Sequence, residues 1–147
     1  VAKAVDAAGG VVVSVIPTPL MKFCHPMIQP ERLVEVKDMH TRKRIMIDRA
    51  DAFLALPGGV GTMEELLETA TWLQLGLHSK RLGVLNVDGY WDSLRAQFTR
   101  ALDSGFTRVR DGYCIFSDGD DLESLLDRLL SDEPHESDVK GLTSWVV

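Results

Sequence analysis

Residues 51–65 read DAFLALPGGVGTMEE, and this stretch decides the fold class of the chain. The apolar run from Asp51 to Leu56 predicts a buried strand, and a helix is predicted to follow from about Thr62 to Leu75. Between them lie three glycines, Gly58, Gly59 and Gly61. A strand, a glycine-rich turn and a helix in this order are typical of an open parallel sheet, which binds ligands beyond the carboxyl ends of its strands.

Strands and helices alternate along the rest of the chain. Helices are expected over 1–8, 38–49, 91–103 and 120–130, and strands over 11–16, 33–36, 81–87 and 113–116. The strand at 11–16 is nearly all apolar, as in a strand buried on both faces. Residues 20–30 look irregular. This order predicts an α/β fold, a Rossmann-like parallel sheet with helices on both faces. We expect one nucleotide-binding domain over 1–130 and a mobile acidic tail over 131–147.

Charge and composition exclude several classes of partner. The formal net charge is −6 at pH 7, so no basic surface for nucleic acid is expected. No apolar run reaches the roughly 18 to 20 residues of a membrane span, and no signal peptide is visible. Cys24 and Cys114 lie far apart and lack the spacing of a zinc site or a disulfide framework. We therefore expect a soluble, cytoplasmic protein.

The glycine-rich turn has the chemistry of a phosphate site. Glycines permit positive φ and let the backbone approach a ligand, while the N–H groups of a helix start attract an anion. The turn lacks the Gly-Lys-Ser/Thr of ATP-binding loops and the GxGxxG spacing of dinucleotide-binding loops. An alternative is a tight turn with a capping box, because Thr62 and Glu65 match the pattern Ser/Thr-x-x-Glu.

A second cluster begins the helix predicted over 38–49. Arg42, Lys43 and Arg44 lie within about two turns of its start, where the helix dipole disfavours a cation by roughly 0.3 to 1 kcal/mol. An anionic ligand would explain them, because guanidinium groups bind phosphate with two parallel hydrogen bonds. The alternative is a solvated basic face.

We interpret the histidines and the large apolar residues of the helices as structural rather than as ligands of a metal or cofactor. His40 has no second ligand at metal spacing on its helix, and His25, His78 and His135 are equally solitary, so no metal is predicted. Four large apolar residues at helical positions are expected in the core rather than as a cofactor platform: Trp72, Leu73, Trp91 and Phe98.

With these residues in hand, the sequence resembles the Lonely guy family of cytokinin riboside 5′-monophosphate phosphoribohydrolases, whose members were often labelled lysine decarboxylases. Its pattern PGGxGTxxE is met by Pro57, Gly58, Gly59, Gly61, Thr62 and Glu65, and MHxRK by Met39, His40, Arg42 and Lys43. The similarity extends over roughly 1–130, including Ala8-Gly9-Gly10 and Leu85-Asn86-Val87-Asp88-Gly89-Tyr90. Family members begin with a further strand and glycine-containing loop, which would lie just upstream of Val1.

The resemblance implies hydrolysis of the N-glycosidic bond of an N6-substituted adenosine 5′-monophosphate, or of AMP, to free base and ribose 5-phosphate. It implies no cofactor and a homodimer, with helices after the two motifs at the interface. The implied catalytic residues are Glu65 and Arg42, and the implied substrate- and phosphate-binding residues are Gly58, Gly59, Gly61, Thr62, Lys43, Met39 and His40. Glu64 is expected only to complement the helix dipole or to contact a ribose hydroxyl.

Two alternative functions belong to other classes. A lysine decarboxylase would hold pyridoxal phosphate as a Schiff base, for which Lys43 is the only lysine near the presumed site. A binding protein without chemistry could use the same turn to hold a nucleotide or a phosphorylated cofactor. Binding of phosphate alone does not call for a carboxylate nearby, so Glu65 together with Arg42 favours the hydrolase.

Overall fold

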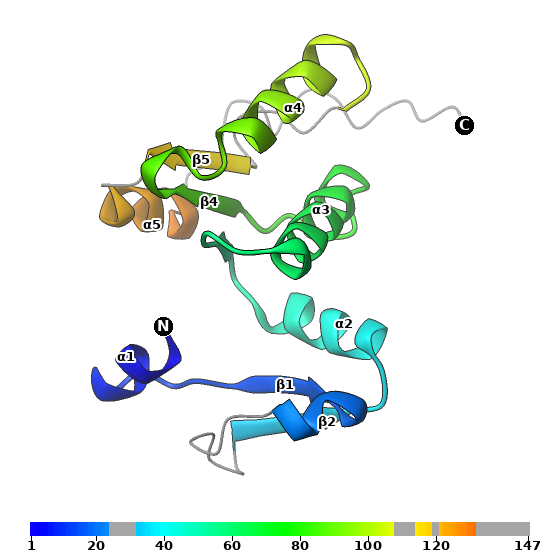
Figure 1. Cartoon of the computed structure of the whole chain (residues 1–147), viewed down its shortest axis with the longest axis vertical. Helices are drawn as coiled ribbons and strands as arrows, with labels where there is room; N and C mark the ends of the chain where they lie inside the picture. The colour runs from blue at the N-terminus through cyan, green and yellow to red at the C-terminus, as the bar shows by residue number, and fades with distance from the viewer. Residues whose placement is uncertain (24–31, 108–113, 119–120, 132–147) are drawn as a thin grey trace. The chain divides into compact units, whose positions relative to one another are not determined.

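The structure is a computed structural model, and it describes residues 1–23, 32–107, 114–118 and 121–131 (Figure 1). The chain divides into two compact units, Val1–Arg49 and Ala50–Val147. Among the described residues, no helix is both long enough and apolar enough to cross a membrane. The expectation of one domain over 1–130 remains a prediction, and nearly all of the predicted tail lies outside the described residues.

The first unit holds two parallel strands and a helix that follows them. Its elements are α1 (Ala2–Ala7), β1 (Ser14–Pro17), the 3-10 helix η1 (Thr18–Phe23), β2 (Leu33–Val36) and α2 (Met39–Arg49). Strands β1 and β2 run parallel, with Ser14 opposite Leu33. Helix η1 occupies part of the stretch expected to be irregular; 24–31 lie outside the described residues.

The expectation that the first strand is buried on both faces is wrong for this unit. Strand β1 is shorter than predicted, and only Val15 and Pro17 of its four residues are buried, whereas Val11 before it is 72% exposed. Alternate burial is the pattern of a strand packed on one face, and α2 is the helix in contact with it here.

The second unit contains a parallel sheet of three strands in the order β3-β4-β5. Its elements are β3 (Phe53–Ala55), α3 (Val60–Gln74), β4 (Leu82–Asn86), the 3-10 turn η3 (Val87–Gly89), α4 (Asp92–Asp103), β5 (Cys114–Asp118) and α5 (Leu122–Leu130). All five residues of the central strand β4 are buried, as expected for a strand covered on both faces. The predicted α/β class, with parallel strands flanked by helices, is confirmed.

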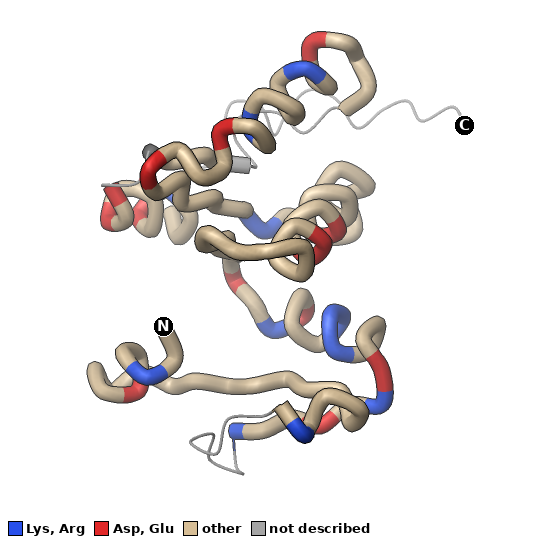
Figure 2. Tube along the Cα trace, viewed as in Figure 1, with Lys and Arg blue, Asp and Glu red and all other residues tan. Residues whose placement is uncertain are grey.

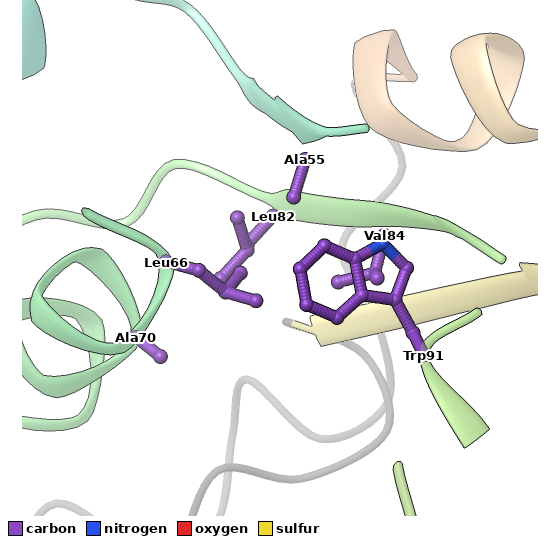
Figure 3. Close-up of a cluster of buried hydrophobic side chains, with 6 residues drawn as sticks. All are labelled: Ala55, Leu66, Ala70, Leu82, Val84 and Trp91. Carbon is purple, nitrogen blue, oxygen red and sulfur yellow. The ribbon is translucent and has the colours of Figure 1, made fainter. Parts of the chain in front are cut away.

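Successive residues of β4 point to opposite faces and build two cores. On one face, β3, β4, α3 and the start of α4 contribute Ala55, Leu66, Ala70, Leu82, Val84 and Trp91. Figure 3 shows the indole of Trp91 lying across Val84, with Leu66 and Leu82 beside it. On the other face, α5 packs Leu125 and Leu129 against Leu85 and Ile115. The predictions of Leu73 and Trp91 as core residues are confirmed, since they are 7% and 1% exposed.

The close packing of α5 explains a glycine inside β4. A Cβ on Gly83 would lie 2.7 Å from Cδ1 of Leu129 and 3.2 Å from Cδ1 of Leu125. Real carbon atoms do not approach so closely without displacement of their neighbours. Glycine at this position therefore lets the helix approach the strand.

Helix ends follow the sequence signals. Gly76, with φ of 70°, ends α3 by a pair of hydrogen bonds from Gly76 N to Leu73 O and from Leu77 N to Trp72 O, a Schellman arrangement. Gly105 follows α4 with φ of 74°. At the start of α5, the Asp121 carboxylate accepts a hydrogen bond from Ser124 N at 3.1 Å.

His78 lies between α3 and β4 and is half-buried. Because Lys80 N donates to Nδ1 at 3.2 Å, the proton of the neutral ring belongs on Nε2, which lies 3.1 Å from Thr69 O. The ring of Phe53 lies against it with centroids 5.4 Å apart. Burial lowers the pKa of His78 below its ordinary value of 6.5, although the bond to Thr69 opposes this shift.

Candidate active site

The glycine-rich turn leads directly from β3 into α3. Helix α3 starts at Val60, with Gly59 as its N-cap and no side chain capping it. Its first hydrogen bond runs from Met63 N to Gly59 O at 3.1 Å. The N–H groups of Val60, Gly61 and Thr62 precede this bond, so they are the donors that a helix start offers to an anion.

The alternative of a Thr62–Glu65 capping box is wrong. The helix begins two residues earlier than predicted, so Thr62 is its third residue and not its N-cap. A residue at that position is already helical, and its side chain cannot take the N-cap role. Glu65 likewise lies beyond the third helical position that the glutamate of a capping box occupies.

The turn glycines do not use the positive φ that glycine permits. None of Gly58, Gly59 and Gly61 is among the described glycines with positive φ, and Gly59 has φ of −92°. Space is the reason for Gly58, because its Cβ would lie only 2.8 Å from Thr62 Cβ and closer still to the Thr62 hydroxyl. Around the Cβ positions of Gly59 and Gly61 nothing lies within 4 Å, which leaves both backbones open to a ligand.

A tyrosine that the sequence did not single out holds the turn. The hydroxyl of Tyr90 donates a hydrogen bond of 2.6 Å to Gly58 O. Tyr90 follows β4, whose carboxyl end lies at the same edge of the parallel sheet as that of β3. The signal was the Asp88-Gly89-Tyr90 stretch directly after a buried strand, which predicts a tight turn at the ligand edge.

Glu65 lies one turn into α3 from the donors. It is half-buried, and helix geometry places it on the same side as Gly61 and Thr62, four and three residues before it. Glu64, three residues after Gly61, is exposed. Figure 2 shows acidic residues gathered along the first half of α3. The second unit thus brings anion donors and a carboxylate onto one helix.

The basic motif occupies the start of α2 in the first unit. Asp38 caps the helix as predicted, accepting a hydrogen bond of 2.7 Å from Thr41 N. Backbone and side-chain hydrogen bonds from Thr41 lower the pKa of the Asp38 carboxyl. Met39 and His40 are exposed in the first turn of the helix.

The three cations of α2 have different surroundings. Arg42 is half-buried, and its Nε donates to Val15 O at 3.0 Å, which ties the helix to β1. Lys43 is 9% exposed, on the same buried side as Ile47. Arg44 pairs with Asp48 one turn later at 3.2 Å on the surface. A solvated basic face describes Arg44 but not Arg42 or Lys43.

The predicted site residues thus fall into two sets. Gly58, Gly59, Gly61, Thr62 and Glu65 lie together on the turn and the start of α3, in the second unit. The remaining four lie together at the start of α2, in the first unit: Met39, His40, Arg42 and Lys43. That both sets meet around one ligand stays a prediction.

The chain is similar over most of its length to known proteins of one family. A family model described as "Possible lysine decarboxylase" matches residues 1–129. The cytokinin riboside 5′-monophosphate phosphoribohydrolase LOG5 of Arabidopsis thaliana is 40% identical over 147 residues, which cover 100% of this chain and 64% of that protein. Its relative LOG7 is 43% identical over 148 residues, covering 99% and 66%. The probable cytokinin riboside 5′-monophosphate phosphoribohydrolase LOGL3 of Oryza sativa subsp. japonica is 43% identical over 148 residues, covering 99% and 68%. The chain spans about two thirds of the length of these relatives.

Proposed function

The chain belongs to the Lonely guy family, and from this membership we propose that it cleaves the N-glycosidic bond of a nucleoside 5′-monophosphate. The substrate is AMP or an adenosine monophosphate substituted at N6, and the products are the free base and ribose 5-phosphate. The observation that carries the proposal is the open start of α3 at the glycine turn, with Glu65 one turn further on.

The phosphate end of the nucleotide fits the start of α3. The N–H groups at Val60, Gly61 and Thr62 and the positive end of the helix dipole attract a dianion. The bare backbone at Gly59 and Gly61 lets phosphate oxygens approach to hydrogen-bonding distance. From the family motif we also propose Met39, His40, Arg42 and Lys43 as residues that bind the substrate.

Glu65 acts on the sugar. When the bond between the anomeric carbon and the base nitrogen breaks, positive charge develops on the ribose ring. A carboxylate beside it stabilises this charge, and it takes a proton from the water whose oxygen adds to the anomeric carbon. Arg42 stabilises the departing base electrostatically, because a guanidinium does not readily give up a proton. The departing base gains a proton overall.

The alternative functions fit less well. The decarboxylase reading rests on the description of the family model alone, whereas the three relatives compared are named phosphoribohydrolases. We derive no step through pyridoxal phosphate. A binding protein without chemistry would use the turn but has no need of a carboxylate aligned with Gly61 and Thr62.

Base release by the parent chain and by Glu65→Gln tests the proposal. Chromatography would follow free base from AMP and from N6-isopentenyladenosine monophosphate. We expect the parent to release base, and the variant to bind nucleotide with little change but to turn over at least about 100-fold more slowly. Glu64→Gln, one residue away and exposed, is the matched control and should keep most activity. Binding without release by the parent would instead establish the binding protein.

We further propose that the protein is a cytoplasmic homodimer. Helix α3 exposes apolar side chains at helical spacing, with Val60 83%, Met63 38% and Leu67 44% exposed. These residues fit an interface between two copies. Light scattering coupled to size exclusion would measure the mass of the assembly, and a monomeric mass would contradict the proposal.

A further inference from the structure

Tyr90 reaches the phosphate turn from a different part of the chain. It lies 32 residues after Gly58, and its hydroxyl donates to Gly58 O at 2.6 Å. Its side chain is not held there by burial, since the residue is 52% exposed. The position of the phenol therefore depends on this hydrogen bond and on the backbone that carries the side chain.

Positive φ angles and the hydrogen bonds of a buried side chain fix the backbone before and after Tyr90. Asp88 and Gly89 have φ of 50° and 71°, in the left-handed region. The buried side chain of Asn86 then accepts a bond of 2.6 Å from Trp91 N and donates one of 2.7 Å to Asp92 Oδ1. The turn is thereby closed on itself at the end of β4.

The neighbouring side chain anchors the same turn in the core. Trp91 is 1% exposed, and its indole meets the Tyr90 ring edge to face, with centroids 4.9 Å apart. Gly89 has φ of 71°, which an L-residue adopts only with strain, so the turn favours glycine at this position. The turn that bears the Tyr90 phenol is therefore fixed in position at the end of β4.

The bond to Gly58 O controls the next N–H group. A trans peptide is planar, with its C=O and N–H pointing in opposite directions. When Tyr90 holds the Gly58 carbonyl, the N–H of Gly59 is turned to the opposite side. Because both residues of this peptide are glycines, little else opposes its rotation.

We propose that Tyr90 is a positioning residue for the phosphate, which orients the Gly58–Gly59 peptide for binding of the 5′-phosphate. This inference rests on the proposed function, since it assumes that the turn binds the phosphate of the substrate. Tyr90 acts through the turn and need not touch the reacting atoms.

The test uses Tyr90→Phe in the full chain, which removes only the hydroxyl. Calorimetric titration with ribose 5-phosphate should show affinity reduced roughly 2- to 10-fold, the loss of about one hydrogen bond's net contribution. With nucleotide substrate, KM should rise by a similar factor while kcat changes little, because the chemistry at the sugar is untouched. Binding of the unphosphorylated riboside should not change.

Thr99→Val is the matched control. It removes an exposed hydroxyl that donates to the Arg95 carbonyl at 3.0 Å in α4, a bond of the same kind away from the turn. It should leave both affinities as they are.

The outcomes separate this inference from the proposed function. If the parent binds ribose 5-phosphate and Tyr90→Phe binds it equally well, Tyr90 has no positioning role, and the hydrolase proposal stands. A fall in kcat with unchanged phosphate affinity would also overturn the positioning role. If the parent chain binds neither ribose 5-phosphate nor nucleotide, both proposals fail.

Discussion

Replacing Gly61 by alanine should make the protein more stable and less active. Gly61 lies in the first turn of α3, its φ is not positive, and no other atom lies within 4 Å of the added Cβ. Alanine at such a position loses less backbone entropy on folding, so the free energy of unfolding should rise by about 0.5 kcal/mol. The melting temperature would rise by about 1 to 2 °C for a domain of this size.

Activity should move in the opposite direction. The space around the Cβ position is where phosphate oxygens are proposed to approach the backbone, so the methyl group competes with the substrate. Displacing a closely packed group costs about 1 to 3 kcal/mol, and kcat/KM for the nucleotide should therefore fall about tenfold or more. Urea unfolding and base release, measured on the same preparation, give the two numbers.

Gly105→Ala provides the matched control. Its Cβ would also meet no atom within 4 Å, but its φ is 74°, which an L-residue adopts only with strain. It should lose about 1 kcal/mol of stability and keep its kcat/KM. A Gly61→Ala variant that is stabilised and fully active would refute the idea that phosphate binds against this backbone.

Two further predictions concern stability. Gly83→Ala should lower the free energy of unfolding by about 1 to 3 kcal/mol, because its Cβ would overlap Leu129. In a Leu129→Ala background the same substitution should cost less, and an equal cost in both backgrounds would show that the overlap is not the cause. The second prediction concerns His78, which is neutral in both the folded and the unfolded protein well above pH 6.5. Because burial lowers its pKa in the folded protein, the histidine takes up a proton in the unfolded protein first as the pH falls. Stability should therefore decline from about pH 7 downward through the folded pKa, and the decline in urea midpoint between pH 7.5 and 5.5 should be smaller in His78→Gln than in the parent.

Much of the second unit could be predicted because its signals are local. The apolar run before Pro57 and the glycines beyond α3 and α4 place strands and helices to within a few residues. The start of α3 was misplaced because Thr62 with Glu65 imitates a capping box, whereas the helix accepts glycine at its N-cap. Local pattern alone does not distinguish these two starts.

The contacts that complete the candidate site are not local, and this is why the sequence did not show them. The bond from Tyr90 to Gly58 spans 32 residues and depends on the pairing of β3 with β4. The bond from Arg42 to Val15 spans 27 residues, and it gives a motif arginine a packing role beside its predicted catalytic one. Spacing in the sequence identifies such residues but not the carbonyl that each one binds.

The burial of Trp91 beside Tyr90 gives the turn a built-in optical reporter. An indole that is 1% exposed, with no hydrogen-bond partner for Nε1 in the part of the chain that the structure describes, should emit at short wavelength. The phenol of Tyr90 lies close enough to quench the emission of this indole or to transfer excitation to the indole. A ligand that strengthens or weakens the hydrogen bond from Tyr90 to Gly58 would then change the contribution of Trp91 to the tryptophan emission, which the chain's two other tryptophans share.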